Sequence, residues 1–151
     1  MIALDTNLLV YAHRAGTAEH AAAKAAILQA VQHRAGWGIS VVCQAEFWAV
    51  VTHPSCPGGP SAPDQAIAFL TNLIKDGGGH VWEGGTGFGF RLLQRAAELN
   101  VAGPRIFDLQ IGLMAYESGA SEIWTNDKQF IRMPGLKVLN PLESSPGTLQ
   151  P

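Results

Sequence analysis

Cysteine is scarce in this chain of 151 residues, and so are charged residues and long apolar runs. The two cysteines, Cys43 and Cys56, form neither a disulfide framework nor the paired thiolate motif of a zinc site. Cys43 lies in an apolar stretch that is typical of a buried thiol. The scarcity of cysteine therefore excludes a disulfide-stapled fold and argues against redox chemistry.

No apolar run approaches the roughly eighteen residues that a membrane span needs. Met1 leads directly into Ile2, without a basic segment or a signal-peptide cleavage site. We therefore expect a cytoplasmic protein that makes no membrane contact.

Only 15% of the residues are charged, and the net charge is -2 with a pI near 6.2. Binding of nucleic acid cannot rest on general basicity, so it must be local or assisted by a metal ion.

Short apolar strands alternate with helices along the chain. The pattern predicts strands over residues 2–5, 38–42, 80–82, 122–125 and 136–139, and helices over 7–14, 18–34, 63–76, 88–99 and 106–117, with a further helix through Glu46 that ends near Pro54. We expect Thr17 to cap the helix over 18–34, and Ser61 with Asp64 to cap the helix over 63–76.

This alternation predicts an α/β fold with a central, mainly parallel sheet that is flanked by helices on both faces. The content of apolar residues, 47%, suits one well-filled domain. We expect that domain to span residues 1–143. The tail, residues 144–151, is poor in apolar residues and is expected to be frayed.

Four of the twelve acidic residues are set among apolar neighbours: Asp5, Glu46, Asp108 and Asp127. Asp5 and Asp127 come just after predicted strands, whereas Glu46 and Asp108 come near the starts of helices. All four should therefore share the carboxyl edge of the sheet, where ligands bind in open α/β folds. Because no Lys or Arg stands beside the cluster to balance it, a hard divalent cation such as Mg²⁺ or Mn²⁺ is the natural compensator.

Helix capping is the simpler explanation for any one of these acids, since an Asp after a strand is usually a turn former or an N-cap. Capping accounts well for Asp5 and Asp108. It gives no reason for Glu46, which lies inside an apolar helix. A shared site accounts for all four residues together.

Four short motifs resemble those of the PIN-domain family, in order and with suitable spacing. They are Leu4-Asp5-Thr6-Asn7-Leu8-Leu9-Val10-Tyr11-Ala12, Ala45-Glu46-Phe47, Asp108-Leu109-Gln110-Ile111-Gly112 and Trp124-Thr125-Asn126-Asp127-Lys128-Gln129-Phe130. The end of the chain, over residues 132–142, is similar to that of the VapC-type toxins of prokaryotic toxin-antitoxin pairs. The resemblance spans nearly the whole chain.

This resemblance implies a metal-dependent endoribonuclease that hydrolyses RNA. The four acids would then hold one or two Mg²⁺ ions, with Mn²⁺ as a possible substitute, and Asn7 and Thr125 would support the site. The resemblance also implies a cognate antitoxin protein and a homodimer. The chain departs from the family at Gln129, where members often carry a further acid, and this puts the strength of a second metal site in doubt.

Two basic pairs at helical spacing, Arg91 with Arg95 and Lys128 with Arg132, are candidate contacts for RNA phosphates. Solvated surface charge explains them equally well. The five histidines lack metal-ligand spacing, and we assign them no role. The Gly-rich stretch over residues 84–89 lacks the Gly-Lys-Ser/Thr ending of a phosphate-binding loop, so we expect a flexible loop there.

Two other functions fit parts of this pattern. One is a catalytically inactive scaffold of the same fold that binds RNA or a protein. The other is a phosphatase with Asp5 as its nucleophile. Phosphatases of the haloacid-dehalogenase kind carry a second Asp two residues later, where this chain has Asn7. Trapping of a covalent aspartyl-phosphate would separate the phosphatase from the nuclease.

Overall fold

The computed structural model describes residues 1–143, so the tail over 144–151 lies outside the described residues. Its centre is a sheet of five strands in the order β3-β2-β1-β4-β5. The strands are β1 (Ile2–Leu4), β2 (Trp37–Ser40), β3 (His80–Trp82), β4 (Glu122–Trp124) and β5 (Lys137–Leu139). Every neighbouring pair is parallel.

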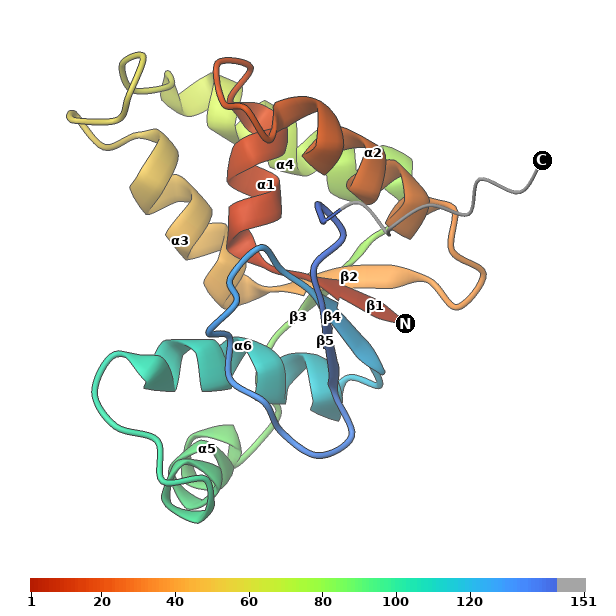
Figure 1. The fold of residues 1–151 in the computed structure, drawn as a ribbon, viewed down its shortest axis with the longest axis vertical. Helices are drawn as coiled ribbons and strands as arrows, with labels where there is room; N and C mark the ends of the chain where they lie inside the picture. Colours follow the sequence, from red (N-terminus) through yellow and green to blue (C-terminus); the bar gives the residue numbers. More distant parts are fainter. Residues whose placement is uncertain (144–151) are drawn as a thin grey trace.

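Helices cover both faces of this sheet (Figure 1). They are α1 (Thr6–His13), α2 (His20–Val31), α3 (Val41–Val51), α4 (Pro63–Gly77), α5 (Phe88–Glu98) and α6 (Arg105–Glu117). Helices α1 to α4 lie on one side of the sheet, and α5 and α6 lie on the other (Figure 1). The predicted α/β fold is confirmed. Within residues 1–143, no helix is both long enough and apolar enough to cross a membrane.

The central strand β1 sets the position of the candidate site. All three of its residues are buried, as expected for a strand covered on both faces. β1 pairs with β2 on one side and with β4 on the other, with Ile2 opposite both Trp37 and Glu122. Successive parts of the chain therefore diverge from β1 in opposite directions, and such a switch point opens a crevice at the carboxyl ends of the strands.

The second strand and the helix after it both begin earlier than the sequence predicts. β2 spans Trp37–Ser40, and α3 begins at Val41. The side chain of Ser40 accepts a hydrogen bond from the backbone N–H of Cys43 at 3.3 Å and so starts the helix. Glu46 consequently lies in the middle of α3, not near its start. The prediction that Cys43 is buried is confirmed.

Two predicted helix caps are wrong, because each side chain has a different partner. Thr17 donates its hydroxyl to the carbonyl of Arg14 at 3.0 Å, closing the turn after α1, and α2 begins only at His20. Ser61 contacts His13 and Arg14. At the start of α4, the side chain of Gln65 accepts a hydrogen bond from the N–H of Ala62 at 3.2 Å.

Candidate active site

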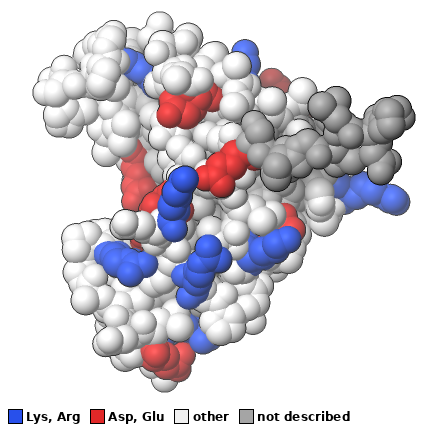
Figure 2. Space-filling model, in the orientation of Figure 1, with Lys and Arg blue, Asp and Glu red and all other residues white. Residues whose placement is uncertain are grey.

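The four acids predicted from the sequence come from four separate elements and meet at the carboxyl edge of the sheet. Asp5 follows β1 and Asp127 lies in the turn after β4, while Glu46 is carried by α3 and Asp108 by the first turn of α6. Acidic side chains are visible in the hollow between the upper and lower helices (Figure 2). Their burial differs: Asp5 is only 6% exposed, Glu46 and Asp108 are half-buried, and Asp127 is exposed.

Asp5 is held by hydrogen bonds to both of its carboxylate oxygens. Oδ1 accepts from the backbone N–H of Thr6 at 2.8 Å, so Asp5 also caps α1. Oδ2 accepts from the side-chain amide of Asn7 at 2.8 Å and from the hydroxyl of Thr125 at 2.6 Å. Capping and a place in the site are therefore compatible for this residue.

Thr125 joins the two strand ends through its buried hydroxyl. Besides donating to Asp5, this hydroxyl accepts from Asn7 Nδ2 at 2.8 Å and from the N–H of Asp127 at 2.9 Å. The side-chain carbonyl of Asn7 accepts from the N–H of Asn126 at 3.0 Å. Asn7 and Thr125 thus fix the end of β4 against the start of α1, which is the supporting position predicted for them.

Glu46 is positioned by a residue that the sequence analysis missed. The hydroxyl of Thr6 donates to Glu46 Oε2 at 2.6 Å across 40 positions of the chain. The partnership depends on which face α3 turns toward α1, and no local motif gives that information. Thr6 therefore links two of the four acids: its N–H donates to Asp5, and its hydroxyl donates to Glu46.

The carboxylates act on one another electrostatically. Burial raises the pKa of Asp5 to about 6, the hydrogen bonds from Thr125 and Thr6 lower it in part, and the charges of Glu46 and Asp108 raise it further. The pKa of Asp108 is also raised, first by burial and then by the charges of Asp127 and Glu46. The mutual effects show that the four acids form one charged cluster.

One cation partly offsets this cluster. Arg105, three residues before Asp108 on α6, lowers the pKa of that carboxyl group against the other causes. The sequence analysis missed Arg105, although its spacing of three on a helix could have indicated the pairing.

The buried thiol of Cys43 also feels the cluster. Burial raises the pKa of this thiol to about 12, with Asp5 and Glu46 adding to the effect, so the thiol stays neutral.

The donor set suits a hard divalent cation, because carboxylate oxygens are the ligands that Mg²⁺ prefers. Within residues 1–143, however, no three His, Cys, Asp or Glu side chains converge closely enough to hold a metal ion. The hydrogen bonds give a reason. Glu46 is turned toward Thr6, and Asp127 Oδ1 accepts from the N–H of Gln129 at 2.8 Å. A bound cation would have to redirect these side chains.

The four candidate RNA-contacting cations differ in their surroundings. Arg91 forms an ion pair with Glu117 at 2.7 Å, and Arg95 pairs with Glu98 at 3.2 Å, so both are engaged by acids. Lys128 and Arg132 lie in the turn and loop after β4, not on a helix as their spacing suggests. Lys128 directly follows Asp127, and Arg132 lies five residues after it.

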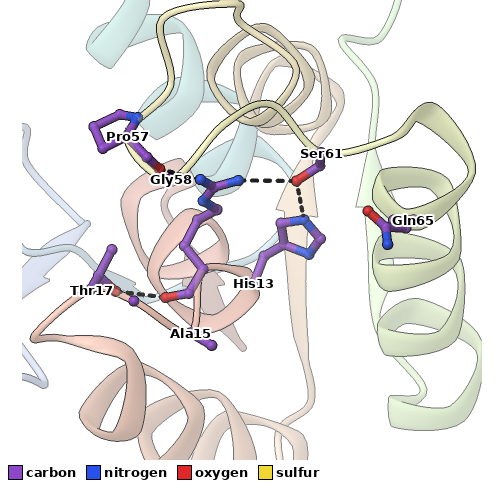
Figure 3. A pocket seen from close by; sticks show the side chains of 9 residues that line it. His13, Ala15, Thr17, Pro57, Gly58, Ser61 and Gln65 are labelled. Atoms are coloured by element: carbon purple, nitrogen blue, oxygen red, sulfur yellow. Dashed lines mark hydrogen bonds between the residues drawn. The ribbon is translucent and has the colours of Figure 1, made fainter.

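A separate cavity of about 680 Å³ lies at the other end of α1 (Figure 3). Arg14 donates from Nη2 to the carbonyls of Pro57 and Gly59, the latter at 2.8 Å, and from Nη1 to the hydroxyl of Ser61 at 3.3 Å. The ring of His13 also contacts that hydroxyl, at 2.9 Å. These side chains hold the α3–α4 loop against α1, and none of the four acids lines the cavity.

Comparison with known proteins gives consistent relatives. The chain is 27% identical over 144 residues to a VapC ribonuclease of Mycobacterium bovis, and it has the same identity to ribonuclease VapC43 of Mycobacterium tuberculosis. Each alignment covers 95% of this chain and 97% of the relative. Ribonuclease VapC48 of Mycobacterium tuberculosis is 27% identical over 63% of this chain and 66% of that protein.

Solved structures share the fold. The sarcin-ricin loop cleaving toxin VapC20 of Mycobacterium tuberculosis matches with a TM-score of 0.66 and 15% identity, over 86% of this chain and 92% of that one. VapBC2 of Rickettsia felis, bound to a DNA fragment from its promoter, matches with a TM-score of 0.66 and 21% identity, over 93% and 98%.

The family assignment rests on the sequence itself. Residues 2–136 match the family described as the PIN domain, and this range includes all four acids and both side chains that support Asp5. The four motifs that suggested this family lie at the carboxyl edge between β1 and β4, on α3 and at the start of α6. The chain therefore belongs to the PIN-domain family.

Proposed function

We propose that this protein is a metal-dependent endoribonuclease that hydrolyses RNA phosphodiester bonds. The observation that carries the proposal is the charged cluster: four acids lie at one sheet edge, where burial first and neighbouring carboxylates second raise the pKa values of Asp5 and Asp108. Such a cluster is unfavourable in an empty protein and becomes favourable when a divalent cation binds. The VapC ribonucleases that match over nearly the full chain support the same chemistry.

In this mechanism the four acids would hold Mg²⁺, or Mn²⁺ in its place. When bound, the metal would lower the pKa of a water molecule, orient it for in-line attack and offset charge on the attacked phosphate. Thr125 and Asn7 hold the carboxylate of Asp5 in a fixed orientation through Oδ2. Thr6 holds Glu46 Oε2 in the metal-free protein, so Glu46 would have to leave this hydrogen bond, or bind through its other oxygen, to act as a ligand.

The geometry does not favour the phosphatase alternative. Phosphatases of the haloacid-dehalogenase kind carry a second Asp two residues after the nucleophile. This chain has Asn7 there, and its side-chain amide donates a hydrogen bond to Asp5 Oδ2. The inactive-scaffold alternative predicts RNA binding without cleavage, so an activity assay separates it from the nuclease.

Cleavage of mixed single-stranded RNA by the purified protein tests the proposal. We expect cleavage with Mg²⁺ or Mn²⁺, no cleavage in EDTA, and no cleavage by Asp5→Asn or Asp108→Asn in either metal. Asp76→Asn, at an exposed position on α4, is the matched control and should cleave like the unmodified protein. Undiminished activity in EDTA, or full activity of both site variants, would refute the metal-nuclease mechanism.

We further propose that the protein is the toxin of a toxin-antitoxin pair and binds a cognate antitoxin protein. The support is the resemblance to VapC-type toxins along the chain, together with two structural neighbours, VapBC2 and FitAB. The FitAB structure, which is bound to a DNA fragment, matches this chain with a TM-score of 0.62. Expression of the chain should arrest growth, and Asp5→Asn should relieve the arrest. Unaffected growth, identical for both proteins, would favour the scaffold instead.

A homodimer also belongs to this proposal. Large apolar side chains are exposed on α5 and α6, with Phe90 81% exposed, Leu93 62% and Phe107 52%. Exposed apolar side chains on neighbouring helices commonly lie in a protein interface when they form one patch, and a second copy of the chain would cover them. Analytical ultracentrifugation should give the mass of two chains for the unmodified protein and a weaker dimer for Phe90→Ser. A monomer at all concentrations would remove the dimer from the proposal.

A further inference from the structure

A polar groove of about 470 Å³ lies beside the acid cluster. It is formed by the segment between α5 and α6 and by the residues after Asp127, and three cations line it: Arg105, Lys128 and Arg132. Lys and Arg side chains gather on the lower half of the face in Figure 2, over α6 and the segment between β4 and β5, next to the acidic hollow. This groove is the part of an otherwise acidic protein that would attract a polyanion.

The groove adjoins the carboxylate of Asp127. Gln129 lines the groove, and its backbone N–H donates to Asp127 Oδ1 at 2.8 Å. Arg105, also in the lining, lies on the first turn of α6 with Asp108. An anion in the groove would therefore lie next to the reacting centre of the proposed nuclease. Cations in this position would also offset the repulsion between the four carboxylates and the phosphates of RNA.

The three cations keep capacity for an external anion. Arg105 donates from Nη2 to the carbonyl of Gln129 at 3.0 Å, which leaves its other N–H groups and its charge available. Lys128 pairs with Glu143 at 3.0 Å, but both side chains are exposed, at 81% and 59%, so this pair is weak. Arg132 has no ion pair among residues 1–143.

The lining of the groove indicates which part of RNA it would contact. Asn100 and Gln129 add side-chain amides to the three cations, and the one aromatic residue in the lining, Phe130, is buried. Cations and amides bind phosphate oxygens, whereas base recognition on single strands relies on exposed aromatic faces. The groove is therefore suited to the sugar-phosphate backbone and not to stacked bases.

We infer that this groove is a phosphate subsite that holds the backbone of a single-stranded RNA next to the bond to be cut, with Arg105 and Arg132 as its main contacts. The inference rests on the proposed nuclease function for its biological meaning. It assigns Arg105, which carries no catalytic role, to substrate binding. It also separates Arg105 and Arg132, which form no ion pair within residues 1–143, from Arg91, which is paired with Glu117, and from Arg95, which lies outside the groove.

Binding measured without cleavage tests the subsite. Fluorescence anisotropy of a labelled single-stranded RNA oligonucleotide in EDTA gives Kd across a salt series. The double variant Arg105→Gln with Arg132→Gln should raise Kd roughly tenfold at low salt. It should also reduce the slope of log Kd against log salt by about 1.4, since each phosphate contact on a single strand contributes about 0.7.

Two further double variants make the result specific. Arg105→Lys with Arg132→Lys keeps both charges and should retain most of the salt slope. If the Gln variants weakened binding only because the loop had collapsed, the Lys variants would lose the slope as well. Arg34→Gln with Arg95→Gln removes two charges outside the groove and should bind like the unmodified protein. Equal losses in the groove and control variants, or an unchanged Kd in the groove variant, would overturn the subsite.

Cleavage kinetics in Mg²⁺ separate this inference from the proposed function. If the protein is the proposed nuclease, Arg132→Gln alone should raise KM severalfold with kcat nearly unchanged, because its contact adds uniform binding. Arg105 is left unchanged in this assay because its charge also acts on Asp108. Weakened binding in a protein that never cleaves RNA would support the subsite and refute the nuclease. Normal cleavage with unchanged KM and Kd would support the nuclease and refute the subsite.

Discussion

The two ends of α1 hold polar side chains in different ways. At its C-terminal end, the charge of Arg14 faces the carbonyls of Pro57 and Gly59 and the hydroxyl of Ser61 (Figure 3). At its N-terminal end, Asp5 faces polar donors but also other carboxylates, and its pKa is raised to about 6. The first network is satisfied by the protein itself. The second leaves an excess of negative charge, which the proposed metal ion would neutralise.

The largest expected difference between the two ends is in catalysis. Asp108→Asn should lower kcat/KM by more than about a hundredfold, beyond what loss of a merely supporting residue costs at a metal site. Arg14→Ala should change kcat/KM by less than about threefold, because Arg14 contacts only the α3–α4 loop. Initial rates on RNA in saturating Mg²⁺ compare the two variants. If Arg14→Ala kept an intact fold but lost as much activity as Asp108→Asn, the C-terminal end of α1 would be as important for catalysis as the acid cluster.

The response to pH should have opposite signs at the two ends. The folded-state pKa of Asp5 is raised from 3.8 to about 6, so the metal-free fold gains stability as pH falls from 7 through this window, by at most about 3 kcal/mol. Asp108 shifts in the same direction. Burial lowers the pKa of His13 from 6.5, so this residue makes the fold lose stability as pH falls below 6.5.

Urea unfolding in EDTA at pH 7 and pH 5 resolves these contributions. Relative to the unmodified protein, His13→Gln should gain more stability on acidification, and Asp5→Asn should gain less. A gain in Asp5→Asn equal to that of the unmodified protein would show that Asp5 does not titrate in this range.

The hydroxyl of Thr125 should contribute to stability at the N-terminal end. Thr125→Val removes the partner of the Asp127 N–H and one of two partners from both Asp5 Oδ2 and Asn7 Nδ2, and it should cost about 1–3 kcal/mol of unfolding free energy. Thr125→Ser keeps the hydroxyl and should lose less. Thr71→Val on α4, a half-buried threonine whose side chain makes no hydrogen bond within residues 1–143, is the control for denaturant melts. Equal losses at positions 71 and 125 would mean that the hydroxyl network adds nothing.

The smallest expected effect is at the C-terminal end. Arg14→Ala should lower the unfolding free energy by about 1–2 kcal/mol, since it removes hydrogen bonds from a charged group to partly exposed acceptors. Arg34→Ala, at an exposed position, should change it by less than about 0.5 kcal/mol. No difference between the two variants would show that the loop is held by packing alone.

Local patterns in the sequence predict much of this arrangement. The apolar strand ahead of Asp5 and the turn residues around Thr125 place both at strand ends, and parallel strands bring those ends together. The parallel sheet follows from the alternation of strands and helices. The same pattern places Glu46 and Asp108 on helices that begin at this edge, and the family resemblance supports the set of four.

The remaining features depend on tertiary geometry that no local pattern contains. The bond between Thr6 and Glu46 requires the packing of α3 against α1, and the groove beside Arg105 requires two distant loops. Thr17 has the composition of an N-cap, yet its hydroxyl closes the preceding turn instead. Side chains with several possible partners are therefore the ones that sequence alone leaves undecided.

The most direct test is a Mg²⁺ titration followed by thermal melts at neutral pH, because the central claim is that Arg105 offsets the carboxylate cluster only in part until a metal cation binds. At about a hundred times its Kd, Mg²⁺ should stabilise the unmodified protein and Asp76→Asn by roughly 2.7 kcal/mol. Asp108→Asn should lose most of this response, while its metal-free Tm stays equal or rises because one repulsive charge has gone. Equal Mg²⁺ shifts in all three proteins, or a clear metal-free destabilisation of Asp108→Asn, would contradict the account and make Asp108 a structural residue of α6.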